Sequence, residues 1–94
     1  MIVTIREEEL VTQVENLSVQ RLHRWIRLGF VRPERVEGLP VYHEVDVARV
    51  RLLRDLENAA EFDEETVPLV LSLLDQIHGL RRAVAGLGGR KNRL

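Results

Sequence analysis

The residues after Thr66 carry the pattern that most restricts how this chain can fold. Six aliphatic side chains recur there at intervals of three and four residues, the spacing of a coiled-coil seam on one side of a helix: Val70, Leu73, Ile77, Leu80, Val84 and Leu87. Leu69, Leu71 and Leu74 widen this face. A 94-residue chain offers few partners for so long a stripe, so we expect a homodimer. The alternative is packing of the stripe against the preceding helix.

The same pattern divides the chain. Thr66 is the expected N-cap of the long helix, because Pro68 is comfortable only in a first turn, where its missing N–H would have no partner. A glycine-rich stretch over 86–89 is expected to end the helix. We therefore predict three parts, namely a head over residues 1–60, a helix for dimerisation and partner binding over 61–87, and a flexible basic tail over 88–94. In the helix, the expected dimer contacts are Val70, Leu73, Ile77, Leu80 and Val84.

A short β-favouring run and two helices are expected at the start of the chain. Ile5 lies in the run, and Glu7 opens the first helix, where acidic side chains suit the positive end of the helix dipole. Ser18 is the expected N-cap of the second helix and Gly29 its end. We expect Trp25 in this helix to be partly buried beneath the following hairpin. The side chains predicted to be buried are Val19, Leu22 and Ile26, and those predicted to be exposed are Arg21, Arg24 and Arg27.

A β-hairpin and a third helix are expected next. Pro33 prevents the second helix from continuing, because the residue before a proline avoids the α region. Extended pieces over 35–37 and 41–43 flank a tip of turn-forming residues over 38–40. The third helix begins at about Glu44. This order predicts a mainly α fold, a winged helix-turn-helix with a small β-wing and a long C-terminal dimerisation helix.

Charge is unevenly distributed, although the net value is only −1. Residues 1–54 carry nine arginines and eight acids, residues 55–80 carry seven acids and neither Lys nor Arg, and residues 81–94 carry five bases and no acid. Only the two ends of the chain could attract phosphate, so the pattern does not predict a surface that fits nucleic acid throughout. The acidic block is typical of a protein-binding surface or of a solvated face.

The head resembles that of MerR-type proteins over residues 2 to about 58. The likeness rests on Ser18-Val19-Gln20-Arg21-Leu22-His23-Arg24-Trp25, on Leu28 to Pro33, on Gly38 to Tyr42 and on Asp46-Val47. It implies that the second helix enters the DNA major groove and that the wing contacts the backbone. On this hypothesis the chain is a dimeric transcription regulator whose nucleic-acid contacts are Arg21, Arg24, Arg27 and Arg35. Arg21, Arg24 and Arg27 also fit the solvent-exposed face of an amphipathic helix.

Two departures from the MerR pattern weaken the expected contact with DNA. The family usually has an arginine and an aromatic residue where this chain has His23 and Arg24. Its wing usually carries an arginine where Pro40 stands, and proline offers a phosphate neither charge nor N–H. Because phosphate contacts supply most non-specific affinity for DNA, we expect the scaffold to be retained and DNA binding to be weakened.

The second half of the chain is similar to the C-terminal helix of the CbpM-type chaperone modulators, which are small MerR-like proteins. The likeness rests on Leu73-Leu74-Asp75-Gln76-Ile77-His78-Gly79-Leu80 and on a proline-containing helix start. It implies binding to the J-domain of a DnaJ/CbpA-type co-chaperone, which restrains stimulation of the Hsp70 ATPase. Since such a J-domain presents a basic helix, the acidic block supplies the expected contacts: Glu57, Glu61, Asp63, Glu64, Glu65 and Asp75.

No motif indicates catalysis. The chain has no Gly-rich phosphate loop after a strand and no nucleophile elbow. It has no cysteine, and its three histidines share no spacing, so neither a metal site nor a cofactor is expected. The N-terminus lacks the features of a secretory signal, and no apolar run reaches the roughly 20 residues of a membrane span. We expect a cytoplasmic, non-enzymatic protein that binds macromolecules, with a purely structural interaction subunit as a third hypothesis.

Overall fold

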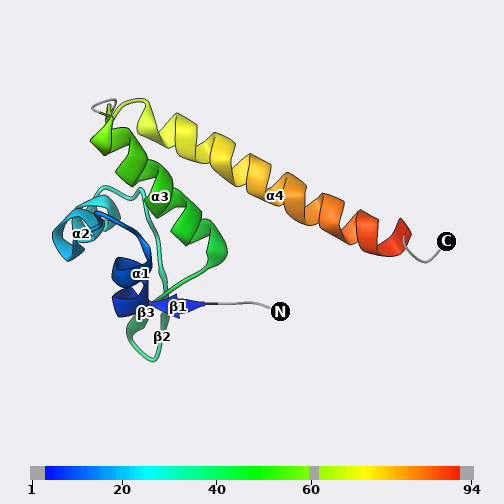
Figure 1. Ribbon diagram of the computed structural model, residues 1–94, viewed down its shortest axis with the longest axis horizontal. Coiled ribbons are helices and arrows are strands. Elements are labelled where there is room, and N and C mark those ends of the chain that lie inside the picture. Colours follow the sequence, from blue (N-terminus) through cyan, green and yellow to red (C-terminus); the bar gives the residue numbers. More distant parts are fainter. Residues whose placement is uncertain (1–3, 60–61, 92–94) are drawn as a thin grey trace.

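The computed structural model describes residues 4–59 and 62–91 (Figure 1). Within these ranges the prediction of a mainly helical fold with a small sheet is confirmed. The elements are, in chain order, β1 (Ile5–Arg6), α1 (Glu7–Gln13), α2 (Val19–Arg27), β2 (Glu34–Val36), β3 (Leu39–Tyr42), α3 (Glu44–Asn58) and α4 (Val67–Lys91). Figure 1 shows α1, α2 and the sheet gathered on one side of α3, with α4 projecting well beyond them.

The two ends of α2 lie where the sequence predicts them. The Ser18 hydroxyl accepts a hydrogen bond from the backbone N–H of Arg21 at 3.2 Å, which satisfies one of the free donors of the first turn. At the other end Gly29 adopts a φ of 81°, and the N–H of Phe30 reaches back to the Trp25 carbonyl at 2.9 Å. A left-handed residue of this kind ends a helix at little cost only when it is glycine.

The three strands form one antiparallel sheet in the order β1-β3-β2. The hairpin between β2 and β3 turns at Glu37 and Gly38, which have φ values of 53° and 80°. The predicted tip over 38–40 is therefore wrong at both ends, because the turn begins one residue earlier, at Glu37, and Leu39 and Pro40 belong to β3. Pro40 is tolerated in this strand because β1 pairs only with Val41 and Tyr42, so the missing N–H lies past the end of β1.

The core lies between α1, α2, β3 and α3, and the start of α4 closes it. Its largest fully buried side chains are Trp25 and Tyr42. Trp25 is completely buried rather than partly buried, and its indole faces α3. The prediction that Val19 is buried is wrong, since 40% of it is exposed. Val19 begins α2, whereas Leu22 and Trp25 lie about one and two turns further on and form the inward side.

The long helix α4 follows Thr66 as predicted but extends further than predicted. It reaches Lys91, so the expected end at residue 87 is wrong, and residues 88–91 of the predicted tail are helical. Glycine costs about 1 kcal/mol relative to alanine inside a helix, which weakens a helix without forcing it to stop. Over residues 67–87 of α4, only Val67 and Leu71 are buried in the core, and every residue from Arg81 to Leu87 is exposed.

Candidate functional site

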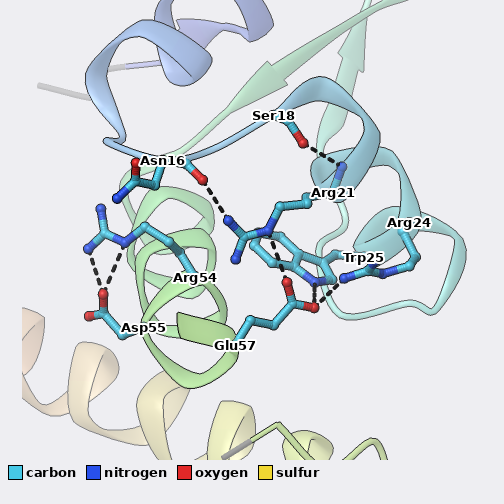
Figure 2. A network of polar contacts seen from close by, with 8 residues as sticks. All are labelled: Asn16, Ser18, Arg21, Arg24, Trp25, Arg54, Asp55 and Glu57. Atoms are coloured by element: carbon cyan, nitrogen blue, oxygen red, sulfur yellow. Dashed lines mark hydrogen bonds and ion pairs between the residues drawn. The ribbon is translucent and has the colours of Figure 1, made fainter. Parts of the chain in front are cut away.

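Glu57 on α3 binds three side chains of α2, as Figure 2 shows. Its Oε1 accepts a hydrogen bond from Nε of Arg21 at 2.9 Å. Its Oε2 accepts one from the indole N–H of Trp25 at 3.2 Å and a charged one from Nη2 of Arg24. One carboxylate therefore joins α2 to α3 and satisfies the polar end of a buried tryptophan.

The environment of Glu57 keeps its carboxylate ionised. Only 17% of the side chain is exposed, and this burial by itself would raise the pKa of Glu57. Hydrogen bonds from Trp25, Arg24 and Arg21 overcome the effect of burial and lower the pKa below its ordinary value. Arg21 is further fixed by a hydrogen bond of 2.6 Å to the Asn16 carbonyl, and its guanidinium lies 5.3 Å from the Trp25 ring centroid.

This network corrects the predicted exposure of one arginine. Arg21, which we expected to be exposed, is only 21% exposed, whereas Arg24 is exposed as predicted, and both pair with the Glu57 carboxylate. Arg27 and Arg35 are exposed and line a hollow of about 360 Å³ between α2 and the hairpin. Arg35 also donates to the Gly38 carbonyl at 3.0 Å. Of the four predicted nucleic-acid contacts, Arg21 is largely covered, whereas Arg24, Arg27 and Arg35 stay exposed.

The six predicted J-domain contacts do not form one surface. Glu57 points inward, and the Asp75 carboxylate receives two hydrogen bonds from Arg49 of α3, one of them from Nε at 3.1 Å. Glu61 lies outside the described residues. The remaining three acids are exposed and adjacent in the turn before α4, and we call them the acidic turn: Asp63, Glu64 and Glu65.

The acidic turn also has a structural role at the start of α4. Oδ1 of Asp63 accepts the backbone N–H of Glu65 at 3.0 Å. The carbonyl of Asp63 accepts the Thr66 hydroxyl at 3.2 Å and the N–H of Val67 at 3.0 Å. Asp63 thus stabilises the turn through its side chain and its backbone carbonyl. The side chains of Glu64 and Glu65 are exposed and make no hydrogen bond or ion pair within the described residues.

The predicted seam of α4 lies open to solvent. The exposed fractions of its side chains are 50% for Leu73, 48% for Ile77, 65% for Leu80, 65% for Val84 and 61% for Leu87, and Leu69 beside the seam is 65% exposed. Val70 is half-buried, at the edge of this stripe. The alternative of a seam packed on α3 is wrong, because α4 uses Val67 and Leu71 of another side for that contact. The stripe is a continuous apolar surface without a partner in the described chain.

A cluster of Glu7, His23 and Tyr42 was not foreseen from the sequence. The Tyr42 hydroxyl donates to Oε1 of Glu7 at 3.0 Å, and Nε2 of His23 lies 3.1 Å from the same oxygen. Burial, followed by the hydrogen bond to Glu7, raises the pKa of Tyr42. The only sequence signal was the β-favouring run that contains Ile5. The structure pairs Ile5 with Tyr42, and this register brings the start of α1 beside β3. The cluster ties α1, α2 and β3 together.

Comparisons with known proteins leave the family open. No protein-family model matches this chain, and no curated protein matches it. Over residues 4–59 and 62–91, no group of three or more His, Asp or Glu side chains is placed to hold a metal ion. In the same part of the chain, no helix combines the length and apolarity that crossing a bilayer requires.

Proposed function

We propose that this protein is a chaperone modulator, a MerR-like winged helix-turn-helix protein that binds the J-domain of a DnaJ/CbpA-type co-chaperone and inhibits its action on Hsp70. The observation that carries the proposal is the pairing of Glu57 with Arg21 and Arg24. The Glu57 carboxylate offsets one of the three positive charges of α2 and holds Arg21 and Arg24 against α3. This weakens the expected reading of DNA by α2 and favours a head that serves as a scaffold for protein contacts. The similarity of residues 73–80 to the CbpM-type helix indicates a J-domain as the partner.

The acidic turn is the contact surface of this proposal. Asp63, Glu64 and Glu65 are exposed and consecutive, at the corner where α3 gives way to α4 (Figure 1). A basic helix would meet concentrated negative charge there, which speeds encounter and rejects acidic competitors. Exposed ion pairs contribute little affinity individually, so we expect a complex whose association rate depends strongly on salt.

Homodimerisation through α4 belongs to the same proposal. The exposed stripe of Leu73, Ile77 and Leu80 would be buried against the same stripe of a second copy. Each dimer would then display two acidic turns, and two binding sites on one particle raise the avidity for clustered J-domains. We place the protein in the cytoplasm, where such co-chaperones act.

The direct test is calorimetric titration with the purified J-domain at two salt concentrations. The variant Glu64→Lys with Glu65→Lys should weaken binding and flatten its salt dependence. Glu8→Lys with Glu15→Lys is the matched control, because both side chains are exposed, make no ion pair within the described residues and give the same change in charge. Equal weakening in both variants would refute the acidic turn as the contact surface. Absence of binding by the unmodified protein would refute the proposed function.

A DNA-binding regulator is the second candidate, and one observation favours it. Arg27 and Arg35 are exposed on two sides of the hollow between α2 and the hairpin, where a MerR-like head would contact DNA. Selection of genomic fragments by the purified protein, repeated with Arg27→Glu plus Arg35→Glu, tests this. Arg21 and Arg24 are unsuitable for the test, since their reversal would break the contacts with Glu57. Fragments that bind only the unmodified protein would establish this function.

A further inference from the structure

A groove runs along the first half of α4, where that helix faces the segment between α2 and β2. Two adjoining hollows of about 360 and 290 Å³ form it, and both are lined by Arg32, Arg49 and Asp75. Apolar side chains contribute at one end, namely Leu28, Pro68 and Leu71. The other end is lined by Val45, His78, Gly79 and Arg82. At 1.5 Å per residue, the stretch of α4 along the groove covers about 20 Å.

The acids of this groove already have partners. The Asp75 carboxylate is held by Arg49, whose Nη1 also donates to the Phe30 carbonyl at 3.0 Å. Asp46 is 7% exposed and accepts the backbone N–H of His43 at 2.9 Å, which caps the start of α3. Neither carboxylate is therefore available to attract a cation into the groove.

The unpaired charge of the groove is positive. Arg32 and Arg82 are exposed where the chain between α2 and β2 approaches the middle of α4. Within residues 4–59 and 62–91 neither guanidinium makes a hydrogen bond or an ion pair. Arginine pairs with carboxylates through two parallel hydrogen bonds, so an exposed guanidinium beside an apolar floor favours a carboxylate ligand.

We propose that this groove binds an extended acidic peptide segment of a partner protein. Its carboxylates would pair with Arg32 and Arg82, and its apolar side chains would cover Leu28 and Pro68. A groove of about 20 Å accommodates about six extended residues at 3.3 Å each. A single small anion would leave most of this groove empty. The proposal does not rest on J-domain binding, because the acidic turn is a separate surface of opposite charge.

Gly79 gives a way to block the groove while preserving the fold. A Cβ atom placed on it meets no other atom within 4 Å, and Gly79 lines the groove. Gly79→Leu therefore fills the groove and also improves the helix propensity of α4. Gly86→Leu is the matched control, because Gly86 is an equally open glycine of the same helix and lines neither hollow.

The experiment selects a random peptide library on the full chain and measures the selected peptides by fluorescence anisotropy. We expect enriched sequences with two or more acids around an apolar residue. Binding should weaken about tenfold or more in Gly79→Leu and in Arg32→Glu with Arg82→Glu, and stay unchanged in Gly86→Leu. If Gly79→Leu fails to fold, as judged by circular dichroism, binding to the double arginine variant alone tests the proposal.

Three results would overturn this proposal. The first is enrichment of basic or purely apolar peptides, or of none. The second is equal binding of acidic peptides to the unmodified chain and to the double arginine variant. The third is displacement of the peptide by inorganic phosphate at matched ionic strength, which would make the groove a simple anion site. The J-domain titration with the Glu64 and Glu65 variant reports on the other surface, so failure of either proposal is recognised separately.

Discussion

Glu57 joins α2 to α3 through three donors, two of them charged. We predict that Glu57→Ala lowers the free energy of unfolding by about 2–3 kcal/mol, because it leaves the buried Trp25 N–H without an acceptor and two guanidiniums without their anion. Denaturant unfolding followed by Trp25 fluorescence measures this. Asp55→Ala is the control, since Asp55 lies on the same helix and, among the described residues, its exposed carboxylate pairs only with the neighbouring Arg54. A similar loss in both variants would contradict the role of Glu57.

The same carboxylate predicts a pH dependence of stability. The folded-state pKa of Glu57 is lowered from 4.5, so the folded protein binds fewer protons at this position than the unfolded chain does. The stability that it contributes is complete above the unfolded pKa and is lost as the pH falls through the folded pKa. We expect denaturant midpoints between about pH 3 and pH 6 to fall less steeply with acid in Glu57→Gln than in the unmodified protein. Parallel curves would show that other carboxylates dominate.

Asp46 shifts in the opposite direction. Burial raises the pKa of Asp46, although the hydrogen bond from the His43 N–H opposes this effect. A raised folded pKa means that the folded protein holds this proton more tightly than the unfolded chain, so stability falls as the pH rises through the raised value. Asp46→Asn should remove that decline, and the same denaturant series measures it. If stability still falls with rising pH in Asp46→Asn, another titratable group causes the decline.

Among the elements, the β2–β3 hairpin stores backbone strain at one position. Glu37 has a φ of 53°, a region that costs a residue with an ordinary side chain about 1 kcal/mol, and Gly38 follows it. Asn-Gly is the preferred pair for a two-residue turn with both φ values positive. We predict that Glu37→Asn raises the free energy of unfolding by about 0.5–1 kcal/mol in denaturant titrations. Glu37→Ala keeps the strain, so an equal gain in that variant would point to charge rather than conformation.

What the sequence predicted well is local, and what it missed is long-range. Ser18 and Gly29 carry their capping information within a few residues, and Pro68 restricts where α4 can begin, so the bounds of α2 and the start of α4 were predictable. The Thr66 side chain, the expected cap, instead donates to the Asp63 carbonyl. The contact between Glu57 and Arg21 joins residues 36 positions apart, and no local spacing indicates it. Charge runs were therefore a poor guide to the site, because counting acids does not tell which of them face inward.

The end of α4 shows the same limit at the scale of an element. Glycines at 86, 88 and 89 predicted a helix end, but the helix continues to Lys91. Propensity sums decide helix ends only where nothing else competes, and here the neighbouring Ala83, Ala85 and Leu87 are strong helix formers. The seam was predictable in its position, since residues three and four apart must share a side. Its exposure agrees with the expectation of a seam free for a second copy, although the sequence left packing on α3 as an alternative, because that depends on where α3 lies.

At the scale of the whole molecule, the three surfaces differ in chemistry. The acidic turn is negative, the groove beside Arg32 and Arg82 is positive, and the stripe of α4 is apolar. The stripe lies along α4 on a side that does not pack on the head, so it can be covered while both charged surfaces stay open. Each of the proposed partners would therefore contact a separate surface.

The last prediction concerns the assembly. From Arg81 to Leu87 every side chain of α4 is exposed, and a helix without tertiary contacts that contains glycine is marginal in water. Burial of one leucine or isoleucine contributes about 1.5–3 kcal/mol, so a second copy covering the stripe would stabilise this end of the helix. Ile77→Asp should therefore give a monomer by light scattering and reduce the helical signal in circular dichroism. Ala85→Asp, exposed on another side of the same helix, should leave both unchanged. A dimer that survives Ile77→Asp but not Ala85→Asp would move the interface to that other side.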